Sequence, residues 1–119
     1  MSSTVSNLRV WQHAMDLAYD VYESTRSFPR QEIYGMASQM RRAAVSIPSN
    51  IAEGKGRSSP KELVQFLFTA RGSLLELETQ TLLAARLGYL EAEQTEHLKR
   101  AIEIIGKELN SLINTVKAA

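Results

Sequence analysis

Apolar residues recur at steps of three and four along most of this chain. That spacing places side chains on one face of an α-helix. The first stripe predicts a helix from about Val10 to Ser27, which ends before Phe28 and Pro29 because the residue preceding a proline disfavours helical dihedral angles. Its apolar members are Trp11, Ala14, Met15, Ala18, Val21 and Tyr22.

A second stripe predicts a helix from near Tyr34 to a glycine stop at Gly54, although it contains a proline. Pro48 cannot donate a backbone hydrogen bond to the Ala44 carbonyl, which costs about 3 kcal/mol in a helix interior. The stripe stays in phase on both sides of Pro48, so we predict one continuous helix that bends there. The apolar members are Ala37, Met40, Ala44, Ile47 and Ile51. Three polar residues are available to satisfy loosened backbone groups: Ser46, Ser49 and Asn50.

The third helix has the clearest start in the chain. Ser59 is a candidate N-cap, Pro60 occupies the first helical position and Glu62 completes a capping box. The helix extends to Leu87, where Gly88 is a natural C-terminal cap. Its pattern includes Leu63, Phe66, Leu67, Ala70, Leu74 and Leu77.

A fourth stripe predicts a helix from about Glu91 to Val116, and the connections between the four helices are short: FPRQEI, GKGRSS and GYL. Four amphipathic helices joined in this way pack most simply as an antiparallel up-down-up-down bundle. We therefore expect an all-α fold, a single four-helix bundle domain over residues 1–119, with a disordered tail at residues 1–7.

The third helix carries more apolar positions than one core requires. At about 100° per residue they spread over an arc of roughly 200°. One interpretation is that this long helix contacts two neighbours in its own bundle, and the other is self-association through the additional face. Arg71 and Glu78 lie two turns apart within the arc. They indicate an ion pair or hydrogen-bond network at a helix contact or interface, with ligand binding as the alternative.

Composition narrows the class of protein. With 119 residues, of which 44% are hydrophobic and 23% charged, the chain suits one soluble globular domain. The absence of cysteine removes thiol nucleophiles and thiolate metal sites, and it fits a reducing, cytoplasmic setting. No apolar run approaches the roughly 20 residues that span a bilayer, so we expect no membrane insertion.

No motif indicates a catalytic, cofactor or metal site. His13 and His97 belong to no E-x-x-H pair, because Val10 and Gln94 stand where a di-iron bundle would carry glutamates. The glycines of GKG follow no predicted strand and lack the rest of a phosphate loop. We therefore expect neither an enzyme nor a cofactor.

Positive charge is concentrated in one part of the chain. The net charge is +1, but residues 34–61 contain five basic residues and one acidic residue, Glu53, which gives +4. Clustered around one predicted connection, these cations are a candidate phosphate-binding patch, although a charge run of this kind is often a solvated surface. The five are Arg41, Arg42, Lys55, Arg57 and Lys61.

Several segments together resemble one known family, the four-helix bundle proteins encoded within intervening sequences of bacterial 23S ribosomal RNA genes. The segments are LRVWQHAMDLAYDVY, YGMASQMRRAAVSIPSNIAEGKGR, KELVQFLFTARGSLLELETQ and LGYL, and the most specific part is RRAAVSIPSNIAEG. A diverged relative is the accessory variability protein of diversity-generating retroelements, a basic, barrel-shaped homopentamer that associates with a reverse transcriptase and with nucleic acid.

The resemblance implies an antiparallel bundle, a ring-shaped homopentamer that uses the wide face of the third helix, and association with RNA or DNA. It supplies no enzyme activity. The residues that match the family's basic positions are Arg41, Arg42, Lys55 and Arg57, with Arg71 in the third helix.

Two functions from different classes follow. The first is a homo-oligomeric module that binds nucleic acid or serves as a ribonucleoprotein accessory, with the basic patch repeated in every subunit. The second is a protein-interaction scaffold that presents helix faces to a partner, with the cations only solubilising its surface.

Overall fold

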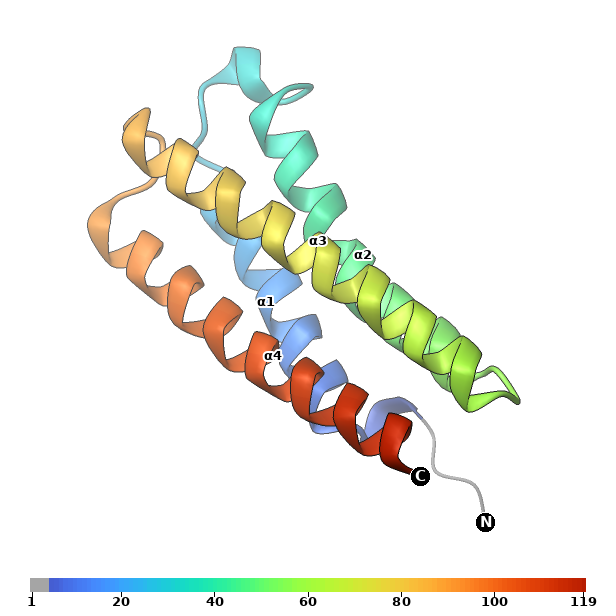
Figure 1. The fold of residues 1–119 in the computed structure, drawn as a ribbon. Coiled ribbons are helices and arrows are strands. Elements are labelled where there is room, and N and C mark those ends of the chain that lie inside the picture. Colours follow the sequence, from blue (N-terminus) through green and yellow to red (C-terminus); the bar gives the residue numbers. More distant parts are fainter. Residues whose placement is uncertain (1–4) are drawn as a thin grey trace.

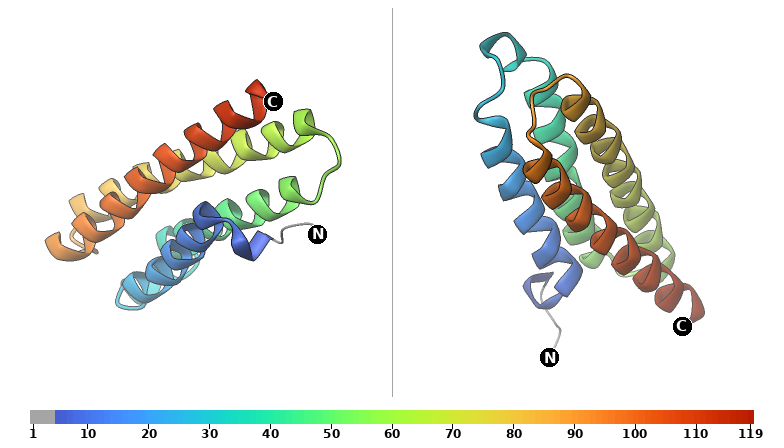
Figure 2. Two further views of the ribbon diagram at one scale, coloured as in Figure 1. Left: turned by 90° about the horizontal axis from the view of Figure 1, so that it is seen from below. Right: turned by 90° about the vertical axis from the view of Figure 1, so that its left-hand side faces the viewer.

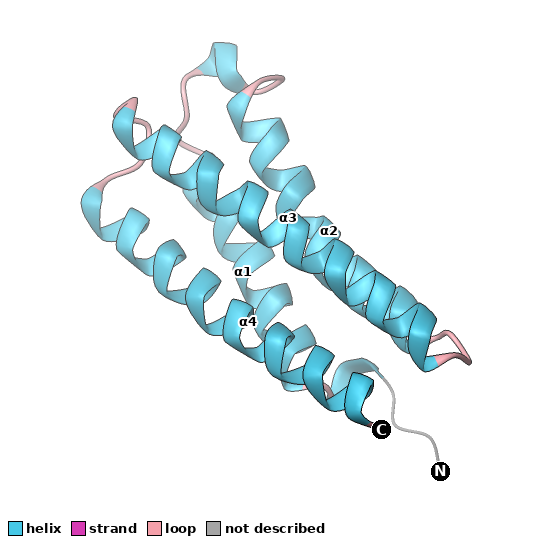
Figure 3. Cartoon of the chain, viewed as in Figure 1, coloured by secondary structure: helices cyan, strands magenta, loops and turns pink. Residues whose placement is uncertain are grey.

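The computed structural model describes residues 5–119 and confirms an all-α bundle. The four helices are α1 (Arg9–Thr25), α2 (Met36–Lys55), α3 (Pro60–Arg86) and α4 (Ala92–Ala118), and no strand occurs among the described residues (Figure 3). Every predicted helix is present, with boundaries within two residues of those expected. Short 3-10 turns at Val5–Asn7 and Arg30–Glu32 precede α1 and α2.

The helices form a four-sided bundle in which each packs against its neighbours in the chain, and α4 returns to pack against α1. The diagonal pairs, α1 with α3 and α2 with α4, have no Cα atoms within 8 Å. In the ribbon each helix runs back alongside the preceding one, and the start of α1 and the end of α4 lie at the same end of the bundle (Figures 1 and 2). The molecule is elongated, with extents of 46 × 22 × 21 Å.

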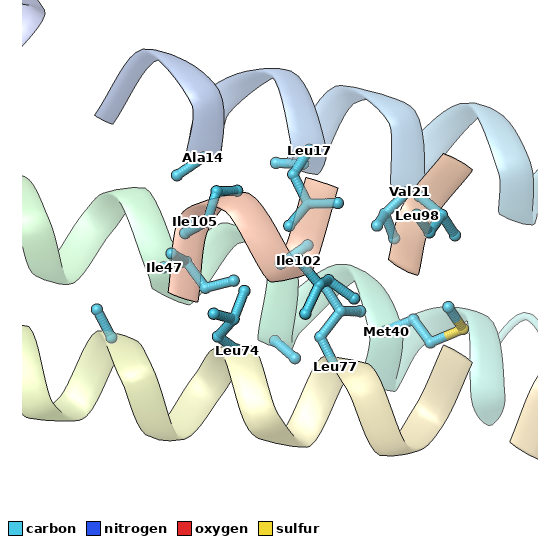
Figure 4. Close-up of a cluster of buried hydrophobic side chains, with 14 of the residues drawn as sticks. Ala14, Leu17, Val21, Met40, Ile47, Leu74, Leu77, Leu98, Ile102 and Ile105 are labelled. Carbon is cyan, nitrogen blue, oxygen red and sulfur yellow. The ribbon is translucent and has the colours of Figure 1, made fainter. Parts of the chain in front are cut away.

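The core contains one buried apolar stripe from each helix. Leu17 and Val21 of α1 meet Met40 and Ile47 of α2 there, and α3 and α4 complete it (Figure 4). Removing these side chains from water is the main favourable contribution to folding. The α3 and α4 members labelled in Figure 4 are Leu74, Leu77, Leu98, Ile102 and Ile105.

Helix α2 continues through Pro48, as its unbroken stripe predicts. The Asn50 side chain donates through Nδ2 to the Ser46 carbonyl at 2.8 Å and to Ser46 Oγ at 3.0 Å. Ser46 Oγ also shares a 2.8 Å hydrogen bond with Ser73 Oγ of α3. Two of the three polar residues expected near the proline thus bond to each other, although at the Ser46 carbonyl and not at the Ala44 carbonyl that Pro48 leaves without an N–H, and Ser46 also joins α2 to α3.

Near its C-terminal end, α2 approaches α3 so closely that only glycine fits. A Cβ atom on Gly54 would lie 2.8 Å from Phe66 Cβ and 3.0 Å from Leu63 Cδ1. Small Ala43 and Ala44, both buried, face the interior earlier in the same helix. Small residues thus allow α2 and α3 to pack at short range.

The connection between α2 and α3 is held by a cap. Ser59 Oγ accepts a 3.3 Å hydrogen bond from the Glu62 backbone N–H, as the predicted N-cap requires. At the far end of α3, Gly88 adopts φ 82°, a conformation that favours glycine, and it ends the helix one residue earlier than expected.

The opposite end of the bundle joins the α1–α2 connection to the α3–α4 connection. Glu32 accepts through Oε1 from the Met36 backbone N–H at 2.9 Å, and through Oε2 from the Tyr89 hydroxyl at 3.1 Å. This hydrogen bond, with burial, raises the pKa of Tyr89 above its ordinary value. Phe28 packs against the Tyr89 ring, with centroids 5.4 Å apart.

Part of the expected tail is structured. Val5–Asn7 form a 3-10 turn, and Val5 packs partly against the core, so the predicted disorder does not hold for residues 5–7. Residues 1–4 lie outside the described part of the chain. Among the described helices, none is both long and apolar enough to cross a membrane.

The contact at Gly54 predicts opposite effects for two glycine substitutions. Gly54→Ala should lower the free energy of unfolding by about 1–3 kcal/mol, because the added methyl group overpacks the α2–α3 contact. Gly72→Ala, on the exposed face of α3 with nothing within 4 Å, should raise it by about 0.5–1 kcal/mol through helix propensity. Urea denaturation measures both. Equal stability of the two variants would contradict the proposed close packing.

Pro48→Ala should leave the bundle folded with a straighter α2. The substitution restores the missing backbone N–H and removes the clash of the ring, which stabilises the helix. It also removes the buried contacts of the ring, which is destabilising, so we expect a net gain of about 1 kcal/mol in unfolding free energy. Thermal unfolding followed by circular dichroism tests this. A decrease of more than about 1 kcal/mol would show that the core requires the geometry imposed by the proline.

Candidate nucleic-acid interface

The five cations of the predicted patch lie in two groups. Arg41 and Arg42 are in the first half of α2, whereas Lys55, Arg57 and Lys61 surround the α2–α3 connection. From Arg41 to Lys55 the helix rises roughly 21 Å, at about 1.5 Å per residue. The two groups therefore do not form one continuous patch on a single chain.

Arg41 serves a structural contact. Its Nε donates to Thr25 Oγ1 at 2.8 Å, and its guanidinium lies over the Tyr22 ring, 4.8 Å from the centroid. The Arg41 side chain thus holds α2 to the end of α1.

Arg42 faces a different neighbour. It is exposed and lies in a hollow between α2 and α3 beside Ser73 and Glu76. Successive residues of a helix project about 100° apart, so adjacent arginines turn toward different sides. The adjacency of Arg41 and Arg42 in the sequence therefore does not place them in one binding site.

At the α2–α3 end, cations from several elements come together. Lys55 and Arg57 line a hollow of about 320 Å³, together with Ser58 and the last turn of α4. Arg57 Nη2 contacts Glu53 Oε2 at 3.1 Å, and its guanidinium lies 4.9 Å from the Phe66 centroid. Lys61 is exposed in the first turn of α3.

A second aromatic ring, Phe68, lies about 200° around α3 from Phe66 and has cations of α3 and α4 over it. The Arg71 guanidinium lies 4.8 Å from the Phe68 centroid, and Lys117 Nζ lies 5.9 Å from the same centroid. Lys117 was not among the predicted site residues, because only the tertiary fold brings the end of α4 to this part of α3. We call Lys55, Arg57, Lys61 and Lys117 the basic end.

The predicted pairing of Arg71 with Glu78 is absent from the described residues. Arg71 instead donates through Nη1 to Asn110 Oδ1 of α4 at 2.9 Å. The favoured interpretation, that Arg71 belongs to a hydrogen-bond network at a helix contact, is therefore correct for Arg71, but its partner was wrong. Glu78 makes no ion pair in the part of the chain that the structure describes.

Both histidines join α1 to α4. His13 Nδ1 lies 2.9 Å from both carboxylate oxygens of Glu108, and His97 Nε2 lies 2.8 Å from Asp20 Oδ2. Each imidazole has a single carboxylate partner. Over residues 5–119, no group of three or more side chains of the metal-binding types is found.

The sequence and fold place this chain in a family. The profile of the family described as 23S rRNA-intervening sequence protein matches residues 6–111. The chain belongs to this family. It is also similar to a crystal structure from Bacteroides thetaiotaomicron, described as a protein with unknown function from the S23 ribosomal protein family, with a TM-score of 0.79 and 26% sequence identity. That similarity covers 87% of this chain and 97% of the other. A search of curated proteins finds no match.

Substitutions of Arg41 and Arg42 test the contact between α1 and α2, because Arg41 makes this contact and the adjacent Arg42 does not. Arg41→Ala should lower the free energy of unfolding by about 1–2 kcal/mol, because the Thr25 hydrogen bond and the stacking on Tyr22 are removed. Arg42→Ala should change it by no more than about 0.5 kcal/mol. Urea titrations of both variants measure the difference. If both substitutions cost the same, the α1–α2 contact of Arg41 contributes nothing to stability.

Proposed function

We propose that this intervening-sequence protein is a non-enzymatic, homo-oligomeric module, a pentameric ring, that binds RNA or DNA as a ribonucleoprotein accessory. The absence of cysteine supports a cytoplasmic setting for it. The observation that carries the nucleic-acid proposal is the basic end, where α2, the following loop, α3 and α4 each contribute a cation.

The basic end has the properties of a phosphate-binding surface. Lysine ammonium groups and the arginine guanidinium bind phosphate oxygens through charge-assisted hydrogen bonds. The ion pair between Arg57 and Glu53 does not prevent this, because both side chains are about half exposed, at 43% and 57%, and such pairs are weak in water. Arg57 can therefore exchange its carboxylate partner for a phosphate.

Assembly would make this modest charge effective. One chain offers four cations at the basic end, opposed nearby by Glu53 and Glu62, so a monomer would bind polyanions weakly. A ring that repeats the basic end in every subunit would contact many phosphates on one nucleic acid, and its affinity would rise by avidity. Exposed apolar residues on α1, α2 and α3 support such self-association.

A scaffold that binds another protein is the second candidate. It is favoured by an apolar groove between α1 and α2, which has the aromatic lining that is common in protein interfaces. In that case the cations of the basic end would serve only solubility.

Removing two cations from the basic end should weaken nucleic-acid binding. We expect Arg57→Ala with Lys61→Ala to lower affinity for an RNA hairpin and for duplex DNA by a similar factor, because phosphates are common to both. The slope of log affinity against log salt should become shallower by about one unit for each phosphate that the variant no longer neutralises. Fluorescence anisotropy at several salt concentrations measures affinity and slope together.

The matched control removes two cations from the opposite end of the bundle, with Arg30→Ala and Arg86→Ala. Both residues are exposed, so the control has the same net charge as the test variant. An equal decrease of binding in both variants would indicate attraction to overall charge without a site. No binding by the wild-type protein at low salt would reject the nucleic-acid role and favour the scaffold.

A further inference from the structure

Helix α3 presents an apolar ridge to solvent. The positions 64, 68, 71, 75, 78 and 82 follow alternating steps of four and three, which place them on one outward seam of a helix. Leu75 is 56% exposed and Leu82 46% exposed, so this part of the ridge is separate from the core stripe, whereas Val64 at its first position also packs against the core. The α3 ridge consists of Val64, Phe68, Arg71, Leu75, Glu78 and Leu82.

A groove of about 630 Å³ lies between α1 and α2. Its floor includes Ala18, whose small side chain leaves a depression between larger neighbours. The lining is almost entirely apolar, with charged side chains at one end only, near Arg26. The α1–α2 groove is lined mainly by Trp11, Met15, Tyr19, Tyr22, Val45 and Pro48.

The ridge and the groove lie on different sides of the molecule. They share no residue, and α3 is diagonal to α1 in the bundle. One copy of the chain can therefore offer its ridge to one neighbour and its groove to another. A contact between two different surfaces of identical subunits produces a ring when the rotation closes.

We propose that the α3 ridge of one copy docks into the α1–α2 groove of the next copy. This inference rests on the proposed homo-oligomer and names the two surfaces that build it. The lengths agree. The ridge from Val64 to Leu82 spans roughly 27 Å of helix, and the groove from Trp11 to Arg26 spans roughly 22 Å, at about 1.5 Å per residue.

The charges on the two surfaces favour a second copy of the chain as the occupant of the groove, and they favour one direction of the incoming α3. Glu78 shares a hollow with Lys99 and Arg100 of α4, but it makes no ion pair among the described residues, and it lies one turn from Leu75. At one end of the groove lie Glu23 and Arg26, which form an ion pair with each other, and Arg41 lies over Tyr22 beside the groove, one turn from Ala18. With Leu75 above Ala18, the Glu78 carboxylate meets this end of the groove, where Arg26 and Arg41 outnumber Glu23.

The other half of the ridge then fits the other half of the groove. Arg71 lies one turn from Leu75 on the side away from Glu78, so in this register it extends toward Met15 and Trp11. In its own chain the Arg71 guanidinium lies over Phe68 and donates to the exposed Asn110, so in the interface it exchanges these exposed contacts for the neighbour's indole ring, over which a guanidinium is favourable. The incoming α3 therefore runs parallel to α1 of its neighbour, and Arg71 is an interface residue, not part of the basic end.

Two single substitutions and their mixture test this contact. Leu75→Glu removes the ridge but leaves the groove, whereas Val45→Glu, at a residue 42% exposed, removes the groove but leaves the ridge. Each variant alone should be monomeric in native mass spectrometry. Mixed in equal amounts, they should form a one-to-one dimer with twice the 13.3 kDa of one chain, because one intact ridge can still meet one intact groove.

Ile104→Glu is the matched control, since Ile104 is 45% exposed on α4 and belongs to neither surface. It should assemble as the wild type does, and circular dichroism should show all three variants folded. The proposed contact is overturned if the mixture stays monomeric. It is also overturned if Val45→Glu still assembles alone, because that result would indicate that α3 pairs with α3 of the neighbour. If the wild-type protein is monomeric at every concentration, both the proposed homo-oligomer and the proposed contact are overturned. If the wild type and all variants assemble, only the proposed contact between ridge and groove is overturned.

Discussion

A four-sided bundle can bury only one face of each helix, and the sequence gives α3 two apolar faces. The inner face, which includes Leu74 and Leu77, fills the core together with stripes from the other three helices. The outer face, centred on Leu75, has no partner helix within the chain, because α3 already has α2 and α4 on its flanks. Neighbouring exposed apolar side chains on one helix face are typical of an interface.

The close packing of α2 against α3 determines where the charges lie. Gly54 lets the two helices meet at short range, and the Ser46–Ser73 hydrogen bond fastens them further along. The tight connection that follows Gly54 carries Arg57, and the stacking of Arg57 on Phe66 directs its guanidinium. The basic end is thus a consequence of the helix contact that also supports the core.

Periodicity was sufficient to predict the helices, because every core stripe repeats at the period of an α-helix. It also predicted the course of α2 through Pro48, since the phase of Ile47 and Ile51 is a property of the sequence alone. The wide apolar arc of α3 indicated a second apolar face. Both a second neighbouring helix in the same bundle and self-association could explain that face. Only the positions of α2 and α4 in the structure show that this face is left exposed.

The candidate site was harder to predict because its members are brought together by tertiary contacts. Arg41 and Arg42 are adjacent in the sequence, yet Arg41 stacks on Tyr22 and Arg42 faces α3. Lys117 lies far along the chain from Phe68, and no local pattern links them. Charge clustering in a sequence identifies a helix end and its loop, whereas the direction of each side chain depends on neighbouring helices.

Native mass spectrometry of the wild-type protein over a range of concentrations tests the central claim, that the second apolar face of α3 is a subunit interface. We expect one closed assembly of five chains, whose size does not grow with concentration because a ring leaves no free ridge or groove. A single chain of 13.3 kDa at every concentration would contradict the claim, since the ridge and the groove would then be stable in contact with water.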